Sequence, residues 1–143
     1  MRTMAATMII GAVLCWLTAG GLVAGEAIDP QRVRSAQANG LQWLVEHQIT
    51  EGPEAGRWPG PNNNYAVATA SFGGLALLAN GHRPADTGYG RSTDLALRYV
   101  MQAMDPDGYL GQGDKSGMYI HAAATLLGLA ALGTLEDPER ERE

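Results

Sequence analysis

The feature that most constrains how this chain folds is an internal repeat with a period of 56 residues. The two halves of the body align at this offset without gaps, and YAVATA, which starts at Tyr65, falls on HAAATL, which starts at His121. The matched pairs include Leu41 with Leu97, Trp43 with Tyr99, Gly52 with Gly108, Ala66 with Ala122, Ala68 with Ala124 and Thr69 with Thr125. Periods of this size are typical of repeat proteins, in which each unit buries its apolar face on its neighbours.

Hydrophobic periodicity predicts two helices in the first half. A helix is expected over 30–48, because Asp29 can cap it, Pro30 suits its first turn, and apolar residues then recur at helical spacing. A loop rich in Gly, Pro and Asn follows over 49–64. The next helix, expected over 65–80, is apolar nearly all round and ends at an Asn-Gly pair, which favours a buried helix with a defined C-terminal stop.

The second half repeats this order. It has a loop over 82–90, a helix over 92–104, a loop over 105–115 and a nearly wholly apolar helix over 118–132. We therefore expect an all-α protein of about four helices, with the amphipathic helices outside and the apolar helices inside.

The repeats should together occupy residues 28–136, as one unit over 28–82 and another over 83–136. The final segment, 137–143, leaves two interpretations open. Its DPER sequence echoes the DPQR that starts at Asp29, which indicates the start of a truncated third repeat, but a charged terminal run is also typical of a solvated tail.

The N-terminal residues 1–27 have the layout of a secretory signal peptide. One basic residue, Arg2, precedes an apolar core over 8–17, and small residues follow it, with cleavage expected after residue 25 or 27. The alternative is an uncleaved anchor, because residues 4–25 carry no charge and are long enough to span a bilayer. In both cases the body is expected to be exported, to the periplasm or the extracellular space.

Composition excludes several functions. The net charge is −5, and no cluster of Lys and Arg provides the electrostatic footprint of a nucleic-acid-binding protein. The single cysteine, Cys15, lies in the N-terminal apolar segment, so the body has no disulfide framework, no cysteine nucleophile and no zinc site built from cysteine. Contact with a membrane is expected only through an uncleaved N-terminal segment.

Each half also carries an aromatic residue, then a glutamine near the helix end, then a glycine and an aromatic residue in the loop. These residues are Trp43, Gln48, Gly56 and Trp58 in the first half, and Tyr99, Gln102, Gly108 and Tyr109 in the second. The pattern resembles the repeats of squalene–hopene cyclases and protein prenyltransferase subunits, an α/α-toroid family. The resemblance implies helical hairpin repeats that form part of a ring, with the glutamine satisfying backbone groups at a helix end and the glycine allowing a tight loop.

The catalytic signatures of that family are missing. The cyclases use an Asp-x-Asp-Asp acid, and the nearest run here, DPDG from Asp105, lacks the third aspartate, while no cysteine remains in the body for the zinc of the prenyltransferases. The resemblance therefore implies an exported repeat protein of the prenyltransferase/squalene-oxidase type, without cofactor or metal, that acts as a non-catalytic packing or binding module. The alternatives are a fragment of a terpene-cyclase-like toroid enzyme and a self-associating structural module, with the chain itself or further toroid repeats as partners.

In a toroid the N-terminal ends of the inner helices line one mouth of the central cavity. This placement predicts an aromatic, concave wall made of Trp58, Tyr65, Tyr119 and His121. The competing interpretation of His121 is a side chain at a helix start that the preceding loop satisfies. We expect no catalytic residue here, because one titratable side chain without a partner is not a general acid–base pair.

Overall fold

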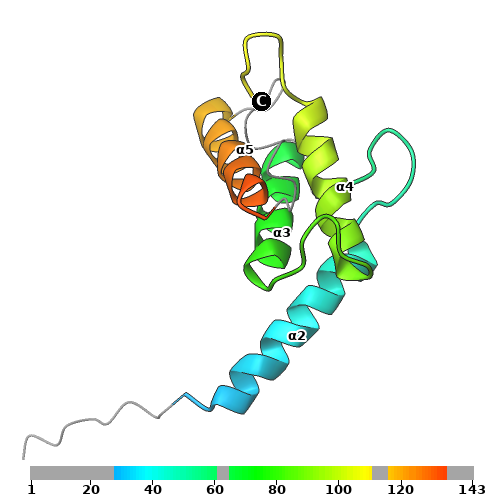
Figure 1. Ribbon diagram of the computed structural model, residues 1–143, viewed down its shortest axis with the longest axis vertical. Coiled ribbons are helices and arrows are strands. Elements are labelled where there is room, and N and C mark those ends of the chain that lie inside the picture. The colour runs from blue at the N-terminus through cyan, green and yellow to red at the C-terminus, as the bar shows by residue number, and fades with distance from the viewer. Residues whose placement is uncertain (1–27, 61–64, 111–115, 135–143) are drawn as a thin grey trace, which may run out of the picture. The chain divides into compact units, whose positions relative to one another are not determined.

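The computed structural model describes residues 28–60, 65–110 and 116–134, and this part of the chain holds four α-helices and no strand. Figure 1 shows these helices, which are α2 (Pro30–His47), α3 (Ala66–Ala79), α4 (Tyr89–Gln102) and α5 (Gly117–Leu132). The all-α prediction is confirmed for these residues. The predicted signal peptide or anchor and the segment 137–143 lie outside them.

The chain divides into two compact units, residues 1–33 and 34–143. In the first unit, the carboxylate of Asp29 accepts a hydrogen bond from the backbone N–H of Gln31 at 2.9 Å. This is the capping interaction that the sequence predicts for the start of α2, because it satisfies one of the N–H groups left without a partner at a helix N-terminus.

In the unit 34–143, helix α3 packs against both α4 and α5, whereas α4 and α5 contact each other little (Figure 1). Small residues make this central position possible. A Cβ added at Gly74 would lie 2.9 Å from Cδ1 of Leu127 on α5 and 3.4 Å from Cβ of Ala96 on α4, so both neighbours approach the α3 backbone at this one residue. A larger side chain there would push the helices apart.

Two clusters of buried side chains form the core. The larger one joins α3, α4 and α5, and consists of Val67, Ala68, Ala70, Val100, Leu110, Ile120, Ala124 and Leu127. The smaller one consists of Trp58, Leu77 and Ala96, and three half-buried residues of α2, Leu41, Leu44 and Val45, pack against it. The second cluster is thus what attaches the C-terminal part of α2 to the rest of this unit.

The loops that follow α2 and α4 close at different lengths. In the first, the N–H of Ile49 donates to the carbonyl of Arg57 at 3.0 Å, and in the second, the N–H of Asp105 donates to the carbonyl of Tyr109 at 2.9 Å. The 56-residue offset therefore aligns the helices but not the loop ends. In the first loop, the residue after the bonded carbonyl is the buried Trp58, and in the second loop it is the buried Leu110. The hydrogen bonds therefore make Trp58 equivalent to Leu110 rather than to Tyr109.

Helix α4 begins at Tyr89, three residues before the predicted start at Ser92. The sequence GYG suggested a loop, but Gly88 takes φ +71° at the N-cap and Gly90 lies inside the helix. A Cβ at Gly90 would collide with the carbonyl of Arg83 and with Asp86, so this glycine allows the preceding turn to lie against the helix.

The predicted C-terminal stop of α3 is confirmed. Gly81 takes φ +84°, and its N–H donates to the carbonyl of Leu78 at 2.9 Å. The N–H of His82 donates to the carbonyl of Leu77 at 3.1 Å, which completes the hydrogen-bond pattern of a left-handed helix cap.

Candidate interaction surface

Trp58 is a core residue. Its indole Nε1 donates to the backbone carbonyl of Leu44 at 2.7 Å, and its ring covers Gly73 of α3 so closely that a Cβ there would lie 2.6 Å from Cη2. The side chain is 5 % exposed. Trp58 therefore joins the end of α2 to the middle of α3, and its hydrogen bond explains why a tryptophan rather than an aliphatic residue occupies this position.

Gln48 is buried, and its side chain bonds to two backbone carbonyls. Its side-chain Nε2 donates to the carbonyl of Gly56 at 3.1 Å and to the carbonyl of Ser92, at the start of α4, at 2.9 Å. One buried amide thus holds the first loop and the second helical pair together. Gln102, assigned the same role in the second half, is exposed, and the 56-residue offset aligns Gln48 with Met104.

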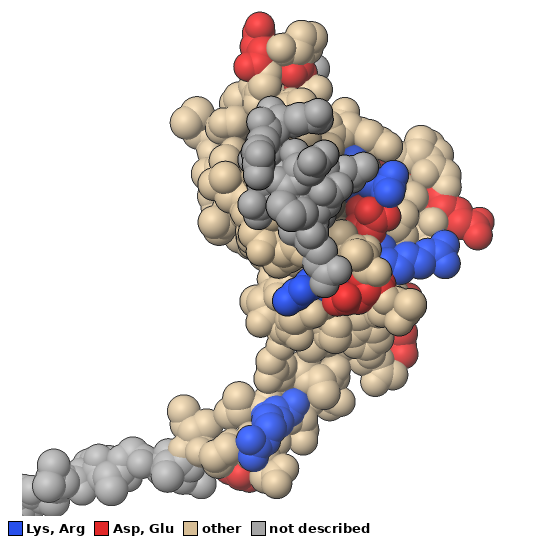
Figure 2. Space-filling view, viewed as in Figure 1, with Lys and Arg blue, Asp and Glu red and all other residues tan. Residues whose placement is uncertain are grey.

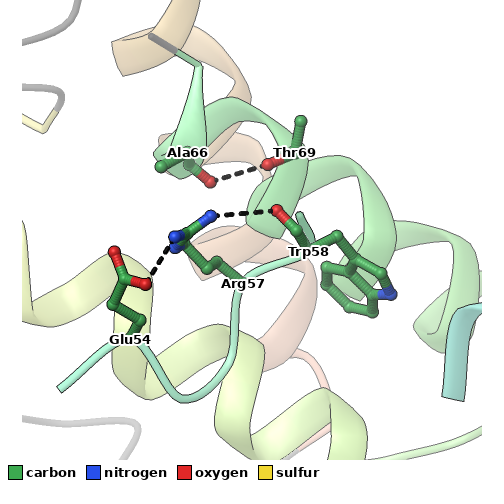
Figure 3. Close-up of polar contacts among 5 residues, drawn as sticks. All are labelled: Glu54, Arg57, Trp58, Ala66 and Thr69. Atoms are coloured by element: carbon green, nitrogen blue, oxygen red, sulfur yellow. Dashed lines mark hydrogen bonds and ion pairs between the residues drawn. The ribbon is translucent and has the colours of Figure 1, made fainter. Parts of the chain in front are cut away.

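Arg57 and Glu54 secure the same loop, and Figure 3 shows their contacts. The guanidinium of Arg57, which is 5 % exposed, donates to Glu54 Oε2 at 2.5 Å and to the carbonyl of Trp58 at 3.4 Å. In Figure 3 it points toward the first turn of α3, where the hydroxyl of Thr69 donates to the carbonyl of Ala66 at 2.9 Å. These contacts fix the loop from within, so they indicate a structural role.

His121 is satisfied by the loop that precedes its helix. Its Nδ1 accepts a hydrogen bond from the backbone N–H of Leu110 at 3.1 Å, and its ring stacks on Tyr109 with centroids 5.0 Å apart. Gly117 leaves room for the Tyr109 ring, because an added Cβ would collide with the tyrosine hydroxyl. The histidine thus anchors the loop to the start of α5.

The other two residues of the predicted cavity wall are exposed. Tyr65 precedes α3, and Tyr119 lies on the first turn of α5, where its ring packs on Phe72 of α3 with centroids 5.9 Å apart. The four residues of the predicted wall therefore have different surroundings: Trp58 lies in the smaller core cluster, His121 contacts the loop after α4, and Tyr119 lies on the surface beside Phe72.

One side of α5 is both exposed and apolar. Its exposed residues carry no charge, although an exposed helix face of a soluble protein normally does. They are Met118, Tyr119, Ala122, Thr125, Leu126, Leu129 and Leu132, and we call them, with the adjoining Phe72 of α3, the α5 outer face. The prediction that this apolar helix lies inside is wrong for this side of it, because α3 and the loop cover only the opposite side.

Of these residues, sequence reasoning singled out Tyr119 alone, and it missed the others for an identifiable reason. The absence of charge along 117–133 is visible in the sequence, but it predicts burial on all sides. Which sides of α5 have a neighbour depends on the positions of α3 and α4 in the folded chain. Leu126 is 55 % exposed and Leu129 is 62 % exposed, whereas Leu127 between them is fully buried.

Among the described residues, charged groups do not define a metal site. Figure 2 shows acidic and basic side chains next to one another over much of the unit 34–143, and acidic groups without a basic neighbour at the top of the view. Within the described ranges, no three His, Cys, Asp or Glu side chains gather closely enough to hold a metal ion. No helix of the described residues is both long enough and apolar enough to cross a membrane.

Comparisons of the chain with protein-family models, with curated proteins and with solved structures gave no match.

Proposed function

We propose that this chain is an exported helical-repeat protein of the α/α-toroid type, and that it acts as a non-catalytic packing or binding module through the α5 outer face. The observation that carries the proposal is the uncharged, exposed side of a helix whose other side is fully packed. Large contiguous exposed apolar surface marks interaction sites, since its contact with water costs free energy.

The loops support a scaffold role. Gln48, Arg57 and His121 each bond to backbone groups of a loop. A catalytic group needs a free acid, base or nucleophile directed at a substrate. Because these three side chains hold loops to helices, they serve the fold, and the α5 outer face remains as the surface that a partner can recognise.

Covering this face would contribute favourable free energy to a contact. Fully burying a leucine side chain contributes roughly 1.5–3 kcal/mol. Leu126, Leu129 and Leu132 are about half exposed, so completing their burial would contribute roughly 1 kcal/mol each. Tyr119 and Phe72 extend the same surface with aromatic rings, which are enriched at the centres of interfaces.

Accessibility in cells tests the binding role without knowledge of the partner. Leu129→Cys and Met101→Cys would each be introduced into the full chain with Cys15→Ser, and both positions would be labelled with a bulky maleimide. Met101 lies on α4 and is 45 % exposed, which makes it a matched control for Leu129. We expect the cysteine at 129 to be protected in cells and to become reactive after purification and dilution. Equal labelling of both positions in cells would refute the binding role.

The export half of the proposal has its own measurement. Mass spectrometry of the chain recovered from its host would give a mature N-terminus at residue 26 or 28 if the segment 1–27 is a signal peptide. An intact chain that fractionates with membranes would indicate the anchor. An intact chain in the soluble cytoplasmic fraction would contradict export.

A further inference from the structure

The open side of α5 matches a covered side of α3. Four residues of α3, Ala70, Gly73, Gly74 and Leu77, are all buried. The 56-residue offset aligns them with Leu126, Leu129, Ala130 and Gly133. Of these, only Ala130 is even half-buried, and the other three are exposed. Near their N-terminal ends the two helices share buried positions: Val67 and Ala68 are buried, and so are Ala123 and Ala124.

The following helical pair closes part of the covered side of α3, and Trp58 of the first loop covers Gly73. Ala96 of α4 and Leu127 of α5 are the two side chains that meet Gly74, and Ala70 belongs to the core cluster that α4 and α5 complete. At Ala70 and Gly74, helix α3 therefore uses this side to receive the next pair of helices. On α5 the same side has no cover within the described residues.

Helix α2 also has a side that no neighbouring element of the described chain covers. At the 56-residue offset, Ala36 and Gly40 of α2 correspond to Ser92 and Ala96 of α4. The two α4 residues are buried, and Ala96 lies against Gly74 of α3, whereas Ala36 and Gly40 are exposed. A Cβ at Gly40 would meet nothing within 4 Å, so this side of α2 has no neighbour at that position.

From these two observations we infer that a second copy of this chain docks head to tail, with α2 of one copy on the α5 outer face of the other. The contact reproduces between copies the packing of α4 on α3 within one copy. This inference rests on the proposed function, since it names the partner of the same surface. Such an interface joins two different patches, so it generates closed rings or open filaments rather than a two-fold dimer.

The chain's own C-terminal segment is a poor alternative cover. The residues EDPERERE that follow Leu135 are charged at every position except the proline. Placing them on the α5 outer face would remove charged groups from water without partners there, which is costly. A second copy instead brings Ala36 and Gly40, whose small side chains permit the close approach seen between Ala96 and Gly74.

Engineered disulfides test the geometry directly. Within one copy, a Cβ at Gly74 lies 3.4 Å from Cβ of Ala96, close to the ~3.8 Å typical of a disulfide. The equivalent pair between copies is Ala130 and Gly40. We would therefore prepare two variants of the full chain with Cys15→Ser, one with Gly40→Cys and one with Ala130→Cys, carrying tags of different mass, and oxidise them alone and mixed.

We expect a disulfide-linked dimer containing one copy of each variant in the mixture, at least about tenfold above either variant alone. Gly40→Cys mixed with Met101→Cys is the matched control, and it should stay at the background level. No product above this control would overturn the inference. Efficient linking of Ala130→Cys to itself would also overturn it, because that result indicates a symmetric contact between two α5 helices.

A second variant separates association from folding. Leu129→Arg replaces an exposed side chain, so the single copy should keep its helical far-UV circular dichroism, while self-association measured by analytical ultracentrifugation weakens on the order of 100-fold because a charge is buried without a partner. Met101→Arg should leave association unchanged. A wild-type chain that stays monomeric at all concentrations would overturn the inference. If Leu129→Cys is nevertheless protected in cells, the binding module stands and its partner is a different protein.

Discussion

Gly73 of α3 gives the sharpest test of how the helices pack. A methyl group there would lie 2.6 Å from Cη2 and 2.8 Å from Cε3 of Trp58, well inside the roughly 3.5–4.0 Å of an optimal contact. The indole cannot move aside easily, because its Nε1 is bonded to the carbonyl of Leu44. Overpacking of this kind costs about 1–3 kcal/mol, whereas Ala in a helix interior is favoured over Gly by about 1 kcal/mol.

Gly128 of α5 provides the matched control. It also lies within a helix, and an added Cβ would meet nothing within 4 Å. Gly128→Ala should therefore raise the free energy of unfolding by up to about 1 kcal/mol through propensity alone. The gain in helix propensity is the same in both variants. The free energy of unfolding of Gly73→Ala should therefore be about 1–3 kcal/mol lower than that of Gly128→Ala.

The assay is urea unfolding of the full chain, followed by far-UV circular dichroism, with the slope of the transition checked for each variant. In a Trp58→Leu background the penalty at Gly73 should disappear, because the ring that the methyl group meets is gone. Equal stabilisation by Gly73→Ala and Gly128→Ala in the wild-type background would refute the close packing of Trp58 on α3.

Three further substitutions test the loops by the same unfolding assay. Gln48→Leu should lower the free energy of unfolding by about 2–3 kcal/mol, since two backbone carbonyls lose their donor, whereas Gln102→Leu on the exposed surface should change it by less than about 0.5 kcal/mol. Gly56→Ala should lower the free energy of unfolding by more than about 3 kcal/mol, because the strain of φ +107° adds to a collision with backbone atoms. Gly52→Ala should lower it by only about 1 kcal/mol, because Gly52 has φ +78° but open space around it. His121→Phe keeps an aromatic ring but leaves a loop N–H without its acceptor, so a loss of about 1–2 kcal/mol is expected, and an unchanged midpoint would contradict the anchoring role.

Local sequence signals predicted the helices well because each signal acts within a few residues. The predicted span 30–48 is observed as Pro30–His47, and the Asn-Gly stop after α3 depends only on the freedom of Gly81 to take a positive φ. The start of α4 was missed because Gly90 is needed for a contact with Arg83, a requirement that no local pattern records.

The candidate surface could be predicted only in part. The sequence identifies His121 and Tyr65 as equivalent positions. It does not show that the histidine Nδ1 accepts a hydrogen bond from a backbone N–H of the preceding loop. The equivalence of Trp58 and Leu110 could not be predicted from the sequence either. The two loops differ in length, and only their hydrogen bonds show which residues correspond.

The sequence by itself determined an all-α chain with two similar halves, since periodicity, caps and the 56-residue offset are properties of neighbouring residues and of the repeat. Only the tertiary structure decided which sides of the two apolar helices are covered. Helix α3 is packed on the side where α5 exposes Leu126 and Leu129. The two helices have similar compositions. They differ in burial because α3 has a neighbouring element on this side, whereas α5 has none there within the described chain.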